Sequence, residues 1–170
     1  MTLLRHLVSI LLLPFVVTVV VPRWLLTSWA HADSRWPPGS MLEGAGRALG
    51  AVLLIAGLAL FAWCVALFAR VGRGTLAPWD PTRRLVAVGP YRHVRNPMIT
   101  GVATILAAES LLFGSRLLAA WLGAFVVINH LYFVLSEEPG LASRFGASYE
   151  EYRASVPRWL PRARPWGGAG

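Results

Sequence analysis

The sequence predicts an all-α membrane protein, a bundle of about four transmembrane helices followed by a cytoplasmic amphipathic helix at the C-terminal end. Hydrophobic residues make up 56% of the 170 residues, and charged residues only 14%. The apolar residues gather in four long runs. This composition is far from that of a soluble domain and typical of a small polytopic membrane protein. We therefore expect a single membrane domain over residues 1–170, with the bilayer as its main solvent.

The first apolar run covers residues 7–21 and is followed by Pro22. It is just long enough to cross a bilayer if it tilts or continues to Leu26. A secretory signal is the alternative, because "AHA" at residues 30–32 is similar to a small-residue cleavage site. We favour a retained helix, since the run ends in a proline and the remaining chain is itself membrane-like.

The second run, residues 48–69, contains 22 uncharged residues. A helix of this length spans a hydrocarbon core of about 30 Å. The third and fourth runs, residues 98–113 and 117–135, are separated only by the letters "GSR". This spacing predicts a tight antiparallel helical hairpin.

The positions of the basic residues predict the orientation of the chain. All 16 are arginines, and they flank the apolar runs, with the largest group between the second and third runs. We expect that loop to face the cytoplasm of a bacterial inner membrane, with both termini and the active site on the same side. The net charge of +8 does not indicate a nucleic-acid partner, because the arginines form no basic stripe with stacking aromatics.

After the fourth run, apolar residues recur every three or four positions with arginine and glutamate between them. This pattern predicts one amphipathic interfacial helix from Gly140 to Val156. The segment "VPRWLPRARPW" overlaps its end and is too rich in proline to be helical.

Metal binding and disulfide formation are not predicted. Cys64 is the single cysteine, so the chain cannot form an internal disulfide. The four histidines, at positions 6, 31, 93 and 130, lack the spacing of metal ligands.

Two polar clusters remain, and the first is "GPYRHVRNPMITG" at residues 89–101. A Gly-Pro pair breaks the chain, and Pro97 restricts Asn96 to extended geometry, so a helix can begin directly afterwards. A helix start favours an anionic group, and Arg92 or Arg95 can hold a carboxylate through two parallel hydrogen bonds. An arginine-rich membrane anchor explains this stretch equally well.

The second cluster is "INHLYFVLSEEPG". On a helix, Asn129, Phe133 and Glu137 share one face, with Asn129 about 12 Å deeper than Glu137. Pro139 is expected to end or kink the helix, which would leave Glu137 and Glu138 at a helix C-terminus, where the helix dipole disfavours negative charge. The pair then needs a cation or a hydroxyl-rich partner nearby, or it pairs with the loop arginines.

These two blocks, with the later "FGASYEEY" and "VPR", resemble the isoprenylcysteine carboxyl methyltransferase and phospholipid methyltransferase superfamily over about residues 82–159. The family pattern is approximately G-x-Y-x-x-x-R-H-P-x-Y-x-G, then E-E-x-x-L-x-x-x-F-G-x-x-Y-x-x-Y. Its members are integral membrane enzymes that use S-adenosylmethionine. Asn96 stands where the family usually has histidine, and Ile99 where it usually has tyrosine.

The resemblance implies a cofactor site made by the loop before the third run and by the acidic pair. The implied cofactor-binding residues are Leu85, Val86, Tyr91, Arg95, Asn96, Pro97, Met98, Glu137 and Glu138. Asn129 and His130 are the implied contacts of the acceptor. Glu137, Glu138 and His130 are the catalytic candidates, because an amine acceptor must lose a proton whereas a carboxylate acceptor needs no base.

The expected function is therefore methyl transfer from S-adenosylmethionine to a carboxylate or amine of a lipid-like acceptor in the membrane. One alternative is an NADPH-dependent membrane reductase of the steroid-reductase type, which looks related at the Arg-x-Pro helix start. Another is a non-catalytic scaffold or lipid-binding member of the family, which the substitutions at Asn96 and Ile99 would allow.

Overall fold

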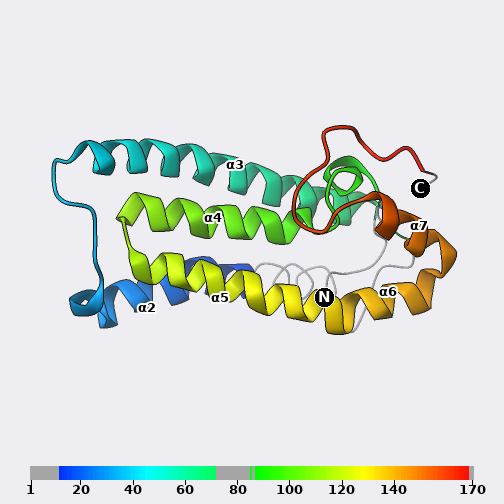
Figure 1. The fold of residues 1–170 in the computed structure, drawn as a ribbon, viewed down its shortest axis with the longest axis horizontal. Helices are drawn as coiled ribbons and strands as arrows, with labels where there is room; N and C mark the ends of the chain where they lie inside the picture. Colours follow the sequence, from blue (N-terminus) through cyan, green and yellow to red (C-terminus); the bar gives the residue numbers. More distant parts are fainter. Residues whose placement is uncertain (1–11, 72–84, 86, 169–170) are drawn as a thin grey trace. The chain divides into compact units, whose positions relative to one another are not determined.

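The computed structural model describes residues 12–71, 85 and 87–168, and every regular element in these residues is a helix (Figure 1). The α-helices are α2 (Val21–Ser28), α3 (Met41–Val71), α4 (Pro97–Phe113), α5 (Arg116–Tyr132), α6 (Glu138–Phe145) and α7 (Ala147–Ser155). Shorter turns are η1 (Val16–Val20), η2 (Ala30–Ala32), η3 (Gly89–Arg92) and η4 (Phe133–Glu137). The all-α prediction is confirmed for the described residues.

Two helical stretches, Met41–Leu67 and Arg116–Phe145, are long and apolar enough to cross a membrane. The apolar helices Leu12–Ser28 and Pro97–Phe113 are shorter. Of the four transmembrane helices that the sequence predicted, two thus have the length and composition of a membrane span. Contacts divide the chain into two compact units, one of residues 1–59 and 101–127, the other of residues 60–100 and 128–170.

In the first unit, α3 and α4 approach closely because α3 presents glycines to its neighbour. A Cβ atom at Gly50 would lie 3.0 Å from the carbonyl oxygen of Ala108, and one at Gly57 would lie 3.0 Å from that of Gly101. Small residues at such positions let the backbones of membrane helices pack against each other.

The predicted hairpin of α4 and α5 is present, and a very short turn joins the two helices. Gly114 has a φ of +63°, a left-handed conformation that favours glycine. The indole nitrogen of Trp36 donates a 2.9 Å hydrogen bond to the carbonyl oxygen of Leu111 at the end of α4. At the start of α5, Asp33 accepts a 3.3 Å hydrogen bond from the amide of Leu117.

The N-terminal helix continues beyond Pro22 to Ser28, in keeping with the expected extension of the first run to Leu26. The π-turn η1 directly precedes α2, and Pro22 occupies the first turn of α2, where a missing amide hydrogen is tolerated. The indole nitrogen of Trp121 in α5 donates a 3.0 Å hydrogen bond to the carbonyl oxygen of Val17.

In the second unit, the helix carrying the two glutamates does not end at Pro139. The π-turn η4 joins α5 to α6, and Pro139 falls in the first turn of α6. Because a proline is accommodated in a first turn, the chain stays helical from Arg116 to Phe145. Glu137 and Glu138 therefore lie inside a continuous helical stretch, and the expected helix C-terminus is wrong.

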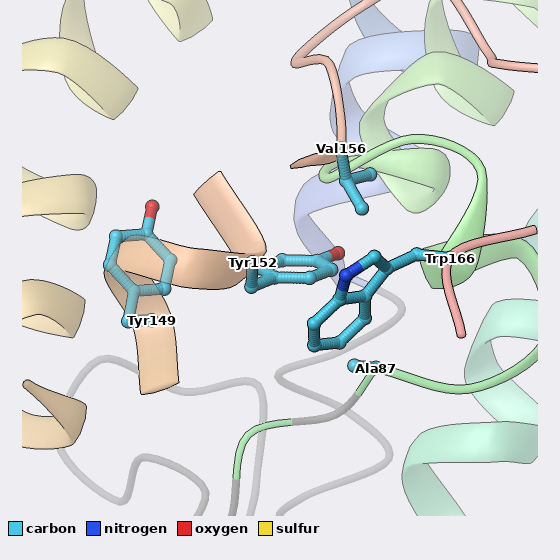
Figure 2. Packing of buried hydrophobic residues seen from close by; sticks show 5 residues of the cluster. All are labelled: Ala87, Tyr149, Tyr152, Val156 and Trp166. Atoms are coloured by element: carbon cyan, nitrogen blue, oxygen red, sulfur yellow. The ribbon is translucent and has the colours of Figure 1, made fainter. Parts of the chain in front are cut away.

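The predicted single amphipathic helix is also wrong, since the chain forms α6 and α7 with a break at Gly146. This glycine has a φ of +54°, which interrupts the helix. The apolar positions that suggested an interfacial helix build a protein core instead (Figure 2). The buried members of this tyrosine cluster are Ala87, Tyr149, Tyr152, Val156 and Trp166.

Candidate functional site

Tyr91 is buried in the loop before α4, with 8% of its surface exposed. Its ring shares a small apolar cluster with Cys64 of α3, and its carbonyl oxygen accepts a 2.6 Å hydrogen bond from the hydroxyl of Tyr152. Burial is the main reason why the pKa of Tyr91 is raised well above its usual value, and the nearby Cys64 adds to the rise. The side chain of Tyr91 thus packs in the interior and fixes the loop.

The helix start predicted by the Asn-Pro pair is present, with α4 beginning at Pro97. The carbonyl oxygen of Asn96 accepts hydrogen bonds from the backbone amide and from the hydroxyl of Thr100, at 3.0 and 2.9 Å. Both bonds use the same backbone acceptor and hold Asn96 directly before the helix. The loop therefore delivers Arg95 and Asn96 to the N-terminal end of a 17-residue helix.

The apolar residues predicted to line the cofactor site are Leu85, Val86 and Met98. Met98 packs against the cluster of Cys64 and Tyr91, and Leu85 packs against the tyrosine cluster. Val86 lies outside the described residues.

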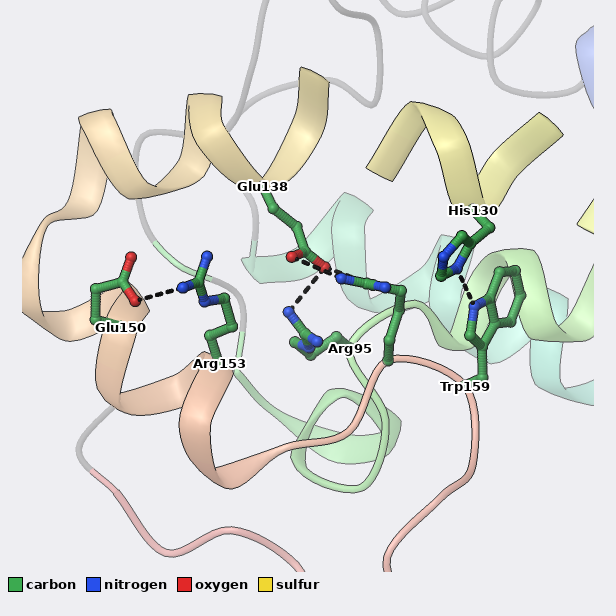
Figure 3. A network of polar contacts seen from close by, with 7 residues as sticks. Arg95, His130, Glu138, Glu150, Arg153 and Trp159 are labelled. Carbon is green, nitrogen blue, oxygen red and sulfur yellow. Dashed lines mark hydrogen bonds and ion pairs between the residues drawn. The ribbon is translucent and has the colours of Figure 1, made fainter. Parts of the chain in front are cut away.

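Glu138 is at the centre of an ion-pair network that joins two distant segments of the chain (Figure 3). Its Oε1 atom accepts a 2.8 Å hydrogen bond from Nη1 of Arg95 and a 2.7 Å hydrogen bond from Nε of Arg158. Its Oε2 atom accepts a 2.9 Å hydrogen bond from Nη2 of Arg158. Both carboxylate oxygens of Glu138 therefore accept hydrogen bonds, and Arg158 makes the bidentate contact.

Arg95 is held among buried groups, with only 12% of its side chain exposed. Besides its bond to Glu138, it contacts Tyr149, whose pKa is raised chiefly by burial and further by the Glu138 carboxylate, while a hydrogen bond to Arg95 opposes the rise. The Nε atom of Arg95 is buried and has no hydrogen-bond partner among the described residues. A buried donor in this state is costly, so it marks a place where an acceptor would be stabilising.

The remaining predicted residues lie along α5 and η4. Glu137 is half-buried in η4 and makes no hydrogen bond or ion pair with the described part of the chain. Asn129 is half-buried in α5, whereas His130 is exposed. The indole nitrogen of Trp159 donates a 3.2 Å hydrogen bond to Nδ1 of His130 (Figure 3). The Trp159 ring lies 5.7 Å from the ring of Phe133.

The proline-rich tail, for which the sequence predicted no role, holds the loop before α4. The amide of Arg95 donates to the carbonyl oxygen of Pro157 at 2.9 Å, and the amides of Arg162 and Trp166 donate to the carbonyl oxygens of His93 and Arg92 at 3.0 and 2.9 Å. Its Val-Pro-Arg motif was part of the resemblance and was the one signal that pointed to Arg158. Pairing of that arginine with Glu138 could not be read from spacing.

The fold and this site define a membrane-associated helical protein with an arginine-carboxylate network at the start of a helix. The sequence profile described as "Phospholipid methyltransferase" matches residues 45–148, which is more than half of the chain. The chain therefore belongs to the phospholipid methyltransferase family, whose chemistry is methyl transfer to a lipid-like substrate.

The chain is also similar to an "Uncharacterized protein" of Haemophilus influenzae. The two are 37% identical over 65 residues, which is 37% of this chain and 100% of the relative. No solved structure matches the chain significantly.

Proposed function

We propose that this protein transfers a methyl group from S-adenosylmethionine to a carboxylate or amine of a lipid-like acceptor held in the membrane. Membership of the phospholipid methyltransferase family supports methyl transfer as the reaction class. The choice of S-adenosylmethionine as the methyl donor rests on the buried Nε atom of Arg95, which lacks a hydrogen-bond partner among the described residues.

The residues around Arg95 fit the amino-acid end of S-adenosylmethionine. A carboxylate oxygen would satisfy the Nε donor of Arg95 through a charge-assisted hydrogen bond. Arg95 lies directly before the N-terminal end of α4, where the helix dipole also favours an anionic group. Asn96 and the adjoining backbone would hold the same end of the molecule, while Pro97, whose side chain is fully buried, fixes the start of the helix.

The two glutamates have different roles in this proposal. Glu138 is engaged by two arginines, so we assign it to organising the site. Glu137 makes no such contact within the described residues, and it would bind the ammonium group or the ribose hydroxyls of the cofactor. Leu85, Val86 and Met98 would line the apolar side, while Tyr91 holds the loop.

When bound, S-adenosylmethionine supplies an activated methyl group on a positively charged sulfonium. The protein then has to align the acceptor and exclude water. A carboxylate acceptor needs no base, whereas an amine must lose a proton, for which Glu137 and His130 are the candidates. Asn129 and His130 would contact the acceptor at the cytoplasmic side of the inner membrane.

The test is transfer of a labelled methyl group by the purified protein in liposomes. The acceptor panel contains a prenylated cysteine, a fatty acid and an aminophospholipid, and binding of S-adenosylhomocysteine and NADPH is measured in parallel by thermal shift. We expect stabilisation by S-adenosylhomocysteine and label in at least one lipid acceptor. Stabilisation by NADPH alone would favour the reductase. Binding of neither nucleotide, with no label transferred, would favour the non-catalytic scaffold.

A further inference from the structure

We infer that Arg158, which lies beyond the residues matched by the family profile, is a positioning residue that keeps Arg95 available for the carboxylate of the methyl donor. The inference rests on the proposed function. It concerns competition between two carboxylates, one on Glu138 and one on the cofactor, for the same guanidinium group.

The division of hydrogen bonds around Glu138 is unequal. Arg158 reaches both carboxylate oxygens, at 2.7 Å from Nε and 2.9 Å from Nη2. Arg95 reaches only Oε1, at 2.8 Å and through Nη1 alone. Since a carboxylate and a guanidinium pair best through two parallel hydrogen bonds, Arg158 has the preferred geometry and Arg95 has a single shared oxygen.

This division leaves Arg95 incompletely paired. Its Nε donor is buried and has no partner within the described residues. The three side chains Arg95, Arg158 and Glu138 carry two positive charges and one negative charge, so the cluster is one negative charge short of neutrality. An incoming carboxylate would supply both the missing acceptor and the missing charge.

Loss of Arg158 would remove this asymmetry. Glu138 is poorly exposed, with 9% of its side chain accessible, so its released oxygens could not turn to water. The nearest cation is Arg95. A bidentate ion pair between Glu138 and Arg95 would occupy the Nε–H group of Arg95, which the cofactor carboxylate needs. Glu138 would then act as an internal competitor of the cofactor carboxylate.

The position of Arg158 is fixed by its neighbours in the chain. Val156 is 1% exposed in the tyrosine cluster, and Pro157 accepts the hydrogen bond from the amide of Arg95. Two residues that precede Arg158 are thus anchored to the core and to the loop that carries Arg95. The guanidinium of Arg158 is delivered to Glu138 from a segment that also touches Arg95 itself.

The test compares two ligands that differ only in the group at issue, S-adenosylmethionine and decarboxylated S-adenosylmethionine. Dissociation constants are measured by calorimetry for the full-length protein in detergent. The quantity of interest is the preference of each variant for the ligand that carries the carboxylate. Arg158→Ala should lower this preference about 10- to 100-fold, the value of one charge-assisted hydrogen bond. Arg158→Lys, a single-point donor, should lower it less.

A double variant separates positioning from general structural support. In Arg158→Ala with Glu138→Gln, the competing carboxylate is absent, so the preference for S-adenosylmethionine should return to within a few-fold of the wild type. The double variant removes one positive and one negative charge, so the net charge of the cluster is the same as in the wild type, which keeps the test valid if the single variant fails to fold. The matched control is Arg153→Ala, because Arg153 pairs with Glu150 on the surface of α7 and does not contact Glu138.

The outcomes distinguish this inference from the proposed function. If the wild type binds neither ligand, the proposed function fails. If the wild type prefers S-adenosylmethionine and Arg158→Ala keeps that preference, the inference is overturned. Equal losses of affinity for both ligands, with no recovery in the double variant, would make Arg158 merely structural and would overturn it as well.

Discussion

The pair of Glu138 and Arg158 should contribute much more to stability than a surface pair in the same part of the chain. The side chains are 9% and 21% exposed, and they share hydrogen bonds of 2.7 and 2.9 Å. The matched pair of Glu150 and Arg153 is 50% and 45% exposed, with its charged atoms 3.2 Å apart. Removing one partner of a poorly exposed pair leaves an uncompensated charge, whereas an exposed charge is screened by solvent.

A double-mutant cycle measures the difference. Glu138→Gln, Arg158→Ala and the double variant should give a coupling free energy of about 1–3 kcal/mol. The cycle of Glu150→Gln and Arg153→Ala should give less than about 0.5 kcal/mol.

The assay is unfolding by heat or denaturant in detergent micelles, with the same detergent for every variant. At about 2–4 °C per kcal/mol for a chain of this size, the coupling corresponds to about 2–12 °C in Tm. A coupling at Glu138 no larger than that of the surface pair would refute the network drawn here.

Other predictions concern the tyrosines and the helix packing. Tyr152→Phe removes the hydrogen bond to the buried carbonyl oxygen of Tyr91 and should lower the free energy of unfolding by about 1–3 kcal/mol, while Tyr132→Phe at an exposed site should change it little. Burial raises the pKa of Tyr152 above the usual 10.0, so the unfolded chain releases its proton first and stability should fall as the pH rises through about 10; a constant Tm from about pH 9 to 11 would contradict this. Gly57→Ala should destabilise by about 1–3 kcal/mol because its Cβ would lie 3.0 Å from the carbonyl oxygen of Gly101, whereas Gly123→Ala, with open space around it, should be neutral or stabilising. Equal melting temperatures of these two alanine variants would refute the close approach of α3 and α4.

Local patterns in the sequence were enough to predict several elements. The uncharged run of residues 48–69 predicted most of α3, and the "GSR" spacing predicted the hairpin of α4 and α5. The Asn-Pro pair predicted the start of α4 at Pro97. Each depends on residues that are neighbours along the chain, where propensity and spacing act directly.

Features that depend on distant residues or on unusual helix geometry were missed. A π-turn has no clear signature in residue types, so Pro139 was expected to end or kink the helix, and its continuation to Phe145 was missed. The tail was judged only by its prolines, although its amide at Trp166 bonds to Arg92, 74 residues earlier in the chain. The pairing of Arg158 with Glu138 likewise joins residues 20 positions apart and required the folded chain.

The central claim is that Arg95 holds the carboxylate of a bound S-adenosylmethionine. Titration of S-adenosylhomocysteine, which keeps that carboxylate, into the wild type and Arg95→Gln tests it most directly. We predict saturable binding to the wild type and a loss of affinity of about tenfold or more in the variant. Equal affinity of the two proteins, or no binding to the wild type, would contradict the claim.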